Sequence, residues 1–309
     1  MSLITDLVQI EFEDGDQGAS VRSLQEYFSE CGFPITVDGI YGPQTRRVLR
    51  MWQFVRFGAG AVDEDSFITT LMMAEDVEVD SEDELAVVTL MSTMREELLN
   101  EQYDGVWASL AKMRADYRVI ETHKFGCDVA WVSIWLLTQG IQEEGQNRGP
   151  WVDVLVELGG GDHLKADPWC ARFVTACRAL ASWLRSDVGK EKSPKFPRSG
   201  SASQLWILSS SPLTRGDAAC MMGSIGGAFV RSRTNKPEWH AQVIRDGEPM
   251  PGHTGVVVDL EGSGFVAVAG NSSGSGHSKD SGAVAVEVLA PTSGHAMRAW
   301  DRLVGVATE

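Results

Sequence analysis

The sequence predicts an α+β fold, with helices dominating the first half and short strands following near the C-terminus. Apolar residues at three- and four-residue spacing, such as Val48, Met51, Trp52 and Val55, indicate amphipathic helices in the first half. Residues 170–184 form a further helical pattern. Three β-branched runs separated by Gly, Ser and Asp then indicate strands at 254–260, 264–269 and 283–289. A long helix followed by antiparallel strands is typical of α+β proteins.

The composition fits a folded protein of two domains and disfavours several kinds of partner. The chain has 309 residues, of which 43% are hydrophobic, and a net charge of −16. This acidity disfavours binding to nucleic acid or to an anionic membrane surface, because both require fields of Lys and Arg. No run approaches the ~18 apolar residues of a membrane-spanning helix, so we expect no membrane insertion. The five cysteines are widely spaced, which disfavours a disulfide framework and a structural zinc site.

The pattern along the chain divides it into three parts. Residues 1–74 are short helical segments with turns, 75–138 are an acidic connector and a helical region, and 139–309 mix helix and strand. The acidic run at 75–84 indicates an exposed connector or the start of a solvated helix. An apolar stripe through Trp107 and Leu110 favours core packing for the helices that follow.

A turn near the N-terminus carries the first functional signal. Gly39 and Gly42 permit a tight turn, which presents Asp38 and Tyr41 on a rigid edge. Thr45 lies just past this turn, where its hydroxyl can satisfy backbone groups near a helix start.

Residues 15–54 resemble the peptidoglycan-binding domain found beside many cell-wall hydrolases. The matching positions are Gly18, Val21, Leu24, Gln25, Asp38, Gly39, Tyr41, Gly42, Thr45, Val48, Leu49, Trp52 and Gln53. The resemblance implies a small three-helix wall-binding domain, in which Asp38, Tyr41 and Thr45 are expected to bind peptidoglycan. The alternative is a three-helix bundle that kept this fold and lost the ligand.

Cys170 carries the second signal. Pro168 precedes the helical pattern, so Cys170 is expected in the first turn of that helix, where the dipole favours a thiolate. His253 begins an apolar strand and is the candidate base. Asn271 ends the next strand, one hairpin away, where its side-chain carbonyl could orient the imidazole. Cys, His and Asn in this order on a helix-then-sheet scaffold is the arrangement of papain-like enzymes.

Other interpretations of these residues compete with this one. Cys177 lies one helix face deeper and is expected in the core, while His163 and His240 are rival bases. Asp162 and His163 with Cys170 suggest a metal, but no second ligand cluster has suitable spacing. We therefore expect neither a metal nor a cofactor.

The C-terminal part resembles the CHAP amidase/peptidase family, papain-like cysteine hydrolases of peptidoglycan. The matching stretches, in the family's order, are 140–147, 168–174, 200–206, 215–217, 252–257 and 270–271. The resemblance implies a papain-like helix-and-antiparallel-sheet domain with Cys170 as nucleophile, His253 as base and Asn271 as orienting residue. The backbone N–H of Cys170 would contribute to the oxyanion hole. Within the same stretches, Trp169 and Glu143 are expected to bind substrate.

The chain departs from this family at 218–251, where an insertion indicates a substrate lid or a specificity loop. The helices between 85 and 138 are covered by neither resemblance.

These features predict an endolysin-like peptidoglycan hydrolase that cuts an amide bond, either the muramoyl–L-alanine bond or a bond within the peptides. The N-terminus lacks the basic segment and apolar run of a signal peptide. We therefore expect synthesis in the cytoplasm and access to the wall through a holin or a secretion system. The alternatives are a catalytically silent wall-binding virion or structural protein, and an intracellular cysteine amidase or protease.

Overall fold

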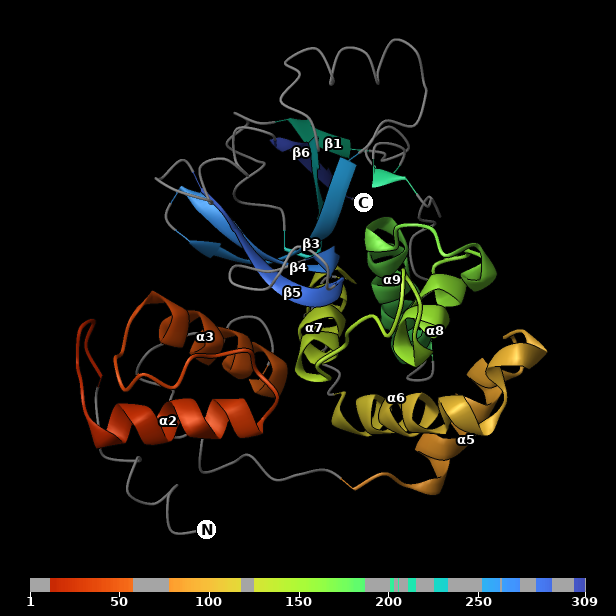
Figure 1. Ribbon diagram of the computed structural model, residues 1–309, viewed down its shortest axis with the longest axis horizontal. Helices are drawn as coiled ribbons and strands as arrows, with labels where there is room; N and C mark the ends of the chain where they lie inside the picture. The colour runs from red at the N-terminus through yellow and green to blue at the C-terminus, as the bar shows by residue number, and fades with distance from the viewer. Residues whose placement is uncertain are drawn as a thin grey trace.

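The computed structural model confirms an α+β architecture of helices and one antiparallel sheet (Figure 1). It describes residues 12–57, 78–117, 125–186, 201–202, 205, 211–214, 225–232, 252–261, 263–272, 282–290 and 303–308. Within these ranges, no helix has both the length and the apolar character needed to cross a membrane. Of the residues singled out from the sequence, His240, Trp206 and the stretch 215–217 lie outside the described ranges.

Within the described part of the N-terminal module, 12–57, there are two helices, α2 (Ala19–Glu30) and α3 (Pro43–Phe57), and a third helix of the expected bundle would lie outside it. Pro43 occupies the first position of α3, where its missing N–H costs no helical hydrogen bond. Leu24 and Phe28 of α2 are buried against Trp52 of α3, which places the apolar spacing seen in the sequence at the interface between the helices.

The acidic run contains the start of a helix. Helix α5 (Ser81–Met91) follows Asp80, whose carboxylate accepts hydrogen bonds from the N–H groups of Glu82 and Asp83. Asp83 in turn accepts from the Asp80 N–H, which completes a capping box. The chain continues through the short 3₁₀ turns η2 (Glu96–Leu98) and η3 (Glu101–Tyr103) into α6 (Asp104–Asp116).

Three further helices follow, and two of them pack against the sheet. They are α7 (Phe125–Thr138), α8 (Pro150–Leu158) and α9 (Cys170–Ser186), with the 3₁₀ turn η4 (His163–Lys165) between the last two. Helices α7 and α9 pack on each other and against the sheet, while α8 packs on α9. Asp128 on α7 pairs with Arg185 of α9. Although α7 falls within the part predicted as connector and helical region, it is therefore continuous with the sheet domain.

Six strands build the sheet in the order β1-β6-β2-β3-β4-β5, and every pair is antiparallel. The strands are β1 (Ser211–Thr214), β2 (Ala228–Ser232), β3 (Gly252–Glu261), β4 (Gly264–Ser272), β5 (Ala283–Leu289) and β6 (Leu303–Thr308). The three strand runs seen in the sequence correspond to β3, β4 and β5. The predicted lid or loop at 218–251 is wrong for 228–232, since this segment is β2, an interior strand paired on both sides.

Alternate residues of a strand point to opposite faces of the sheet, and here both faces are apolar. On β3 and β4, Val256 and Val268 join the helices in the main core. Their neighbours Val257 and Ala267 join a second cluster with Phe229 on the opposite face. Helix α9 therefore lies on one side of a sheet whose other side holds its own core.

The N-terminal module is docked on the sheet domain through α3. Arg47 donates to both carboxylate oxygens of Glu261, with Nη2 2.9 Å from Oε1, and Arg50 Nη2 lies 2.6 Å from Asp259 Oδ1. In Figure 1, helix α7 stands between α3 on one side and the pair α8 and α9 on the other. Trp131 of α7 adds a hydrogen bond of 2.7 Å from its indole Nε1 to the carbonyl of Val55.

A glycine of the module allows a second close approach, at the C-terminal end of α7. Gly32 has a φ of 85°, and a Cβ atom there would lie 2.1 Å from the carbonyl oxygen of Thr138, at the end of α7. Only a residue without a side chain fits at this position, so the module contacts α7 at its C-terminal end as well as at Trp131.

We predict that Arg47→Glu/Arg50→Glu loosens the module, because two pairs of opposite charges become pairs of like charges. Each half-exposed pair contributes about 0.2–1 kcal/mol, so the loss is small in energy and visible mainly in shape. Small-angle X-ray scattering should show a larger maximum dimension, and the swap that adds Asp259→Arg/Glu261→Arg should restore it. Arg46→Glu is the matched control, because Arg46 pairs with Asp14 inside the module. Equal scattering from all variants would contradict docking by these pairs.

Candidate functional site

Cys170 is the first residue of α9, as the sequence predicts. The N–H of Phe173 donates to the carbonyl of Trp169 across 2.7 Å, which closes the first turn of the helix around Cys170. The apolar face of α9, including Phe173 and Cys177, is fully buried and fixes the helix on the sheet. The side chain of Cys170 is itself 3% exposed.

His253 lies on β3 and contacts the thiol. Its imidazole is 4% exposed and packs on the ring of Phe229, with ring centroids 5.9 Å apart. The imidazole and the thiol of Cys170 share a hydrogen bond. The structure thus brings Cys170 and His253 into contact, although they lie far apart in the sequence.

The second partner of His253 is a glutamate that the sequence reasoning missed. Nε2 of His253 donates to Oε1 of Glu287 across 2.7 Å, and Glu287 is 6% exposed on β5. Because Nε2 is engaged in this way, Nδ1 is the ring nitrogen that remains for the thiol. The run Ala283–Leu289 did contain a signal, since Glu287 is its one charged residue and a buried charge in an apolar strand needs a partner.

Burial and the neighbouring polar groups determine the charges of His253 and Glu287. Burial alone would lower the pKa of His253, but the charge of Glu287 and the hydrogen bonds to Cys170 and Glu287 raise it to about 9. Burial alone would raise the pKa of Glu287, but His253, Arg231 and the hydroxyl of Ser272 hold it well below its usual range. At neutral pH the imidazolium and the carboxylate are therefore both charged and paired.

Asn271 does not orient the imidazole, so this predicted contact needs correction. Its side-chain Nδ2 instead donates to Oδ1 of Asn147 across 3.0 Å, and Nδ2 of Asn147 donates to the carbonyl of Ala166. Asn147, Ala166 and Asn271 all have a left-handed backbone, with φ of 54°, 50° and 52°. The amide side chains of Asn147 and Asn271 thus tie the end of β4 to the segment leading into Cys170, and Glu287 holds the imidazole.

Trp169 and Glu143 support the start of α9. Trp169 is fully buried, and its indole Nε1 donates to Oε1 of Glu143 across 2.7 Å. The other carboxylate oxygen of Glu143 accepts from the N–H of Asn147. Gly270 makes room for this indole, since a Cβ atom there would lie 2.5 Å from Trp169 Cζ3. The expected substrate contact of Trp169 is therefore replaced by a packing role beside Cys170.

The three residues predicted to bind the wall form the inner support of their turn. Tyr41 and Thr45 are buried, and Tyr41 stacks on Phe12. Gln25, also buried, donates through Nε2 to Asp38, Thr45 and the carbonyl of Ile40, and its Oε1 accepts from the N–H of Gly39. Asp38 alone has an exposed side chain. The motif thus specifies the shape of the turn, and its buried members are not available to a ligand.

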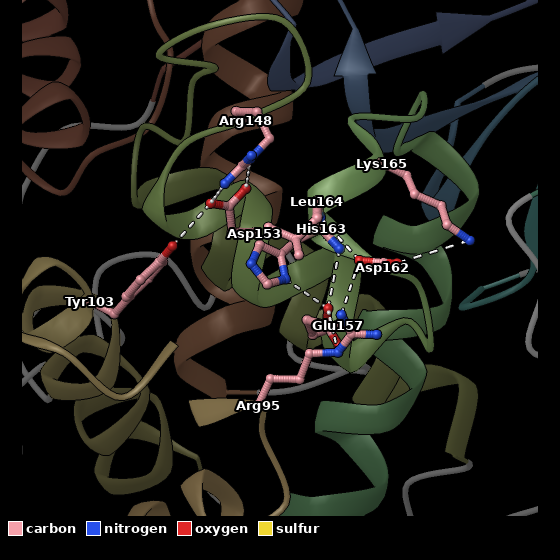
Figure 2. Close-up of polar contacts among 9 residues, drawn as sticks. All are labelled: Arg95, Tyr103, Arg148, Asp153, Glu157, Asp162, His163, Leu164 and Lys165. Carbon is pink, nitrogen blue, oxygen red and sulfur yellow. Dashed lines mark hydrogen bonds and ion pairs between the residues drawn. The ribbon is translucent and has the colours of Figure 1, made fainter. Parts of the chain in front are cut away.

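The rival base His163 belongs to an ion-pair network (Figure 2). Its Nδ1 donates to Oε1 of Glu157 across 2.7 Å, and Asp162 lies close enough for the three side chains to surround a metal ion. Arg95 lies 3.4 Å from Glu157 and 3.0 Å from Asp162, and Lys165 lies 3.9 Å from Asp162. Arg95 and Lys165 thus neutralise the charges of Glu157 and Asp162. The same ion pairs join the 95–103 region to α8 and η4.

A second network in the same view fixes the loop before α8. Arg148 donates from Nε and Nη2 to the two oxygens of Asp153, at 2.7 and 3.0 Å, and the hydroxyl of Tyr103 donates to Asp153 across 3.1 Å (Figure 2). This loop also carries Asn147, so its position bears on the segment before Cys170.

Comparison with known proteins identifies the N-terminal module. Residues 17–58 match the family described as putative peptidoglycan binding domain. Neither a curated protein nor a solved structure gives a significant match to the chain. The matched segment contains α2 and α3, so the docked helical module is the part of the chain that associates with the cell wall.

We predict that Glu287→Gln lowers the pKa of His253 from its raised value of about 9. The variant keeps the shape of the side chain but removes the negative charge, so burial then favours the neutral imidazole. Nuclear magnetic resonance titration of labelled histidines measures this, with the signal assigned by its loss in His253→Gln. Asn271→Gly, which tolerates the left-handed backbone, is the control and should leave this pKa unchanged. The opposite pattern would make Asn271 the orienting residue.

Proposed function

We propose that the protein is a cysteine hydrolase of peptidoglycan that cuts an amide bond. The observation that carries this proposal is the buried series Cys170, His253 and Glu287, in which each side chain is hydrogen-bonded to the next. Such a series supplies a nucleophile, a base and a group that orients the base. The peptidoglycan-binding module supports the choice of substrate.

The geometry supports a thiolate at Cys170. A cysteine at a helix N-terminus and beside an imidazolium is stabilised as a thiolate, and α9 and His253 provide both. The paired carboxylate of Glu287 in turn keeps His253 protonated at neutral pH. The resting site is then a thiolate–imidazolium pair with a buried counter-ion.

The reaction follows from these charges. The Cys170 sulfur attacks the amide carbonyl, and the N–H groups of the first turn of α9, which point out of the helix end, stabilise the developing oxyanion. His253 gives its proton to the amine as the C–N bond breaks, leaving a thioester on Cys170. Neutral His253 then takes a proton from water, the resulting hydroxide attacks the thioester, and a carboxylate product and the thiolate are released.

The sequence resembles the CHAP family in this domain, and a cysteine on a helix with a histidine on a strand fits that resemblance. The chain differs at the third position, where Glu287 takes the place expected for Asn271. An ionised partner stabilises imidazolium more than a neutral amide does, so this exchange favours the charged resting pair.

We predict that Cys170→Ala abolishes release of peptides or amines from purified sacculi, with a loss of about 10⁴-fold or more. Mass spectrometry of the digest identifies the bond as well as the activity. Cys177→Ala is the matched control, because Cys177 is fully buried in the same helix and should affect only stability.

Equal release by Cys170→Ala and the unmodified protein would refute the thiol mechanism. Binding to sacculi without any release by the unmodified protein would instead favour a wall-binding protein without catalytic activity.

A further inference from the structure

Three strands converge on the carboxylate of Glu287. Ser272 of β4 donates its hydroxyl to Oε1 across 2.6 Å, beside the His253 bond from β3. Arg231 of β2 donates from Nη2 to the other oxygen, Oε2, across 3.0 Å. His253 and Arg231 are direct partners in the register of β2 and β3, so both side chains reach Glu287 from neighbouring positions.

Arg231 is the permanent positive charge of this group. The titratable groups that face His253 are Glu287 from β5 and Cys170 from α9, and those that face Glu287 are His253 and Arg231. Ser272 contributes a hydrogen bond without a charge. Glu287, His253 and Cys170 can each change protonation, so among the described residues around the site Arg231 is the partner whose charge stays fixed across the working pH.

We propose that Arg231 is a positioning residue of the thiol site, which anchors Glu287 against His253 and sets the pH range in which the thiolate–imidazolium pair exists. This proposal rests on the proposed function for its link to turnover. The residue lies within 218–251, the part of the chain that the family resemblance does not cover.

The physical basis is the effect of one partly buried cation on the titrating groups of the site. A positive charge lowers the pKa of every group near it, because it favours the form with one proton fewer. Removing it therefore raises the pKa of Glu287, His253 and Cys170 together. Both limbs of a bell-shaped pH profile should then move to higher pH, whereas loss of structural support alone lowers the rate and leaves the limbs in place.

The test compares Arg231→Gln with Arg231→Lys. The Gln variant should shift the pH profile of sacculus hydrolysis and the pKa of His253 upward by about one unit. The Lys variant keeps the charge and should restore both values to within a few tenths of a unit. Arg185→Gln is the matched control, because it removes another buried Arg–carboxylate pair on the far part of α9 and should shift neither value.

Each outcome decides the proposal separately from the proposed function. An upward shift of the His253 pKa by nuclear magnetic resonance supports the role of Arg231 even if no variant hydrolyses sacculi. Hydrolysis by the Gln variant with unshifted limbs overturns it and leaves the proposed function standing. If the Gln variant does not fold, a Lys variant whose profile shifts by a full unit overturns it as well.

Discussion

The buried carboxylate of Glu287 constrains the sheet more than any other group in the site. An ionised carboxylate removed from water costs several kcal/mol unless charged and hydrogen-bonding partners surround it. Glu287 finds those partners on three different strands, with His253, Arg231 and Ser272 each supplying a donor. The order β2-β3-β4-β5 is therefore the arrangement that satisfies the charge, and the orientation of the imidazole follows from it.

Hydrogen bonds from neutral and charged side chains also fix the segment that leads into α9. Glu143 fixes the indole of Trp169, and the pair of Asn147 and Asn271 joins the loop before α8 to the end of β4. Left-handed residues outside glycine cost about 1–3 kcal/mol each and persist where surrounding contacts impose them. Three of them, linked by side-chain hydrogen bonds, stand at the point where the chain must deliver Cys170 to His253.

The wall-binding module and the sheet domain share a contact rather than only a linker. Arg47 and Arg50 of α3 pair with two carboxylates at the end of β3, and the candidate base His253 is the second residue of the same strand. A module held in this way keeps a constant position relative to Cys170. Under the proposed function, this fixed position would determine which part of a bound wall polymer reaches the thiol.

The local pattern of the sequence determined the helices and several strands. Spacing of apolar residues identified α3 and α9, and β-branched runs identified β3, β4 and β5, since these periods reflect burial on one face. It also placed Cys170 at a helix start and His253 on a strand. Motif matching was less reliable for roles: Tyr41, Thr45 and Trp169 hold local structure, because a motif preserves the residues that shape a turn as readily as those that touch a ligand.

Only the tertiary structure decided the contacts between distant residues. Glu287 lies 34 positions from His253, and no spacing in the sequence indicates that the sheet will bring their side chains together. The same holds for Arg231. Its segment has no clear strand pattern in the sequence, yet it forms β2 and pairs with β3 on one side and β6 on the other. The sequence by itself determined several of the helices and strands and the position of the thiol at a helix start. The pairing of strands decided its partners, because register and strand order depend on the burial of the whole sheet.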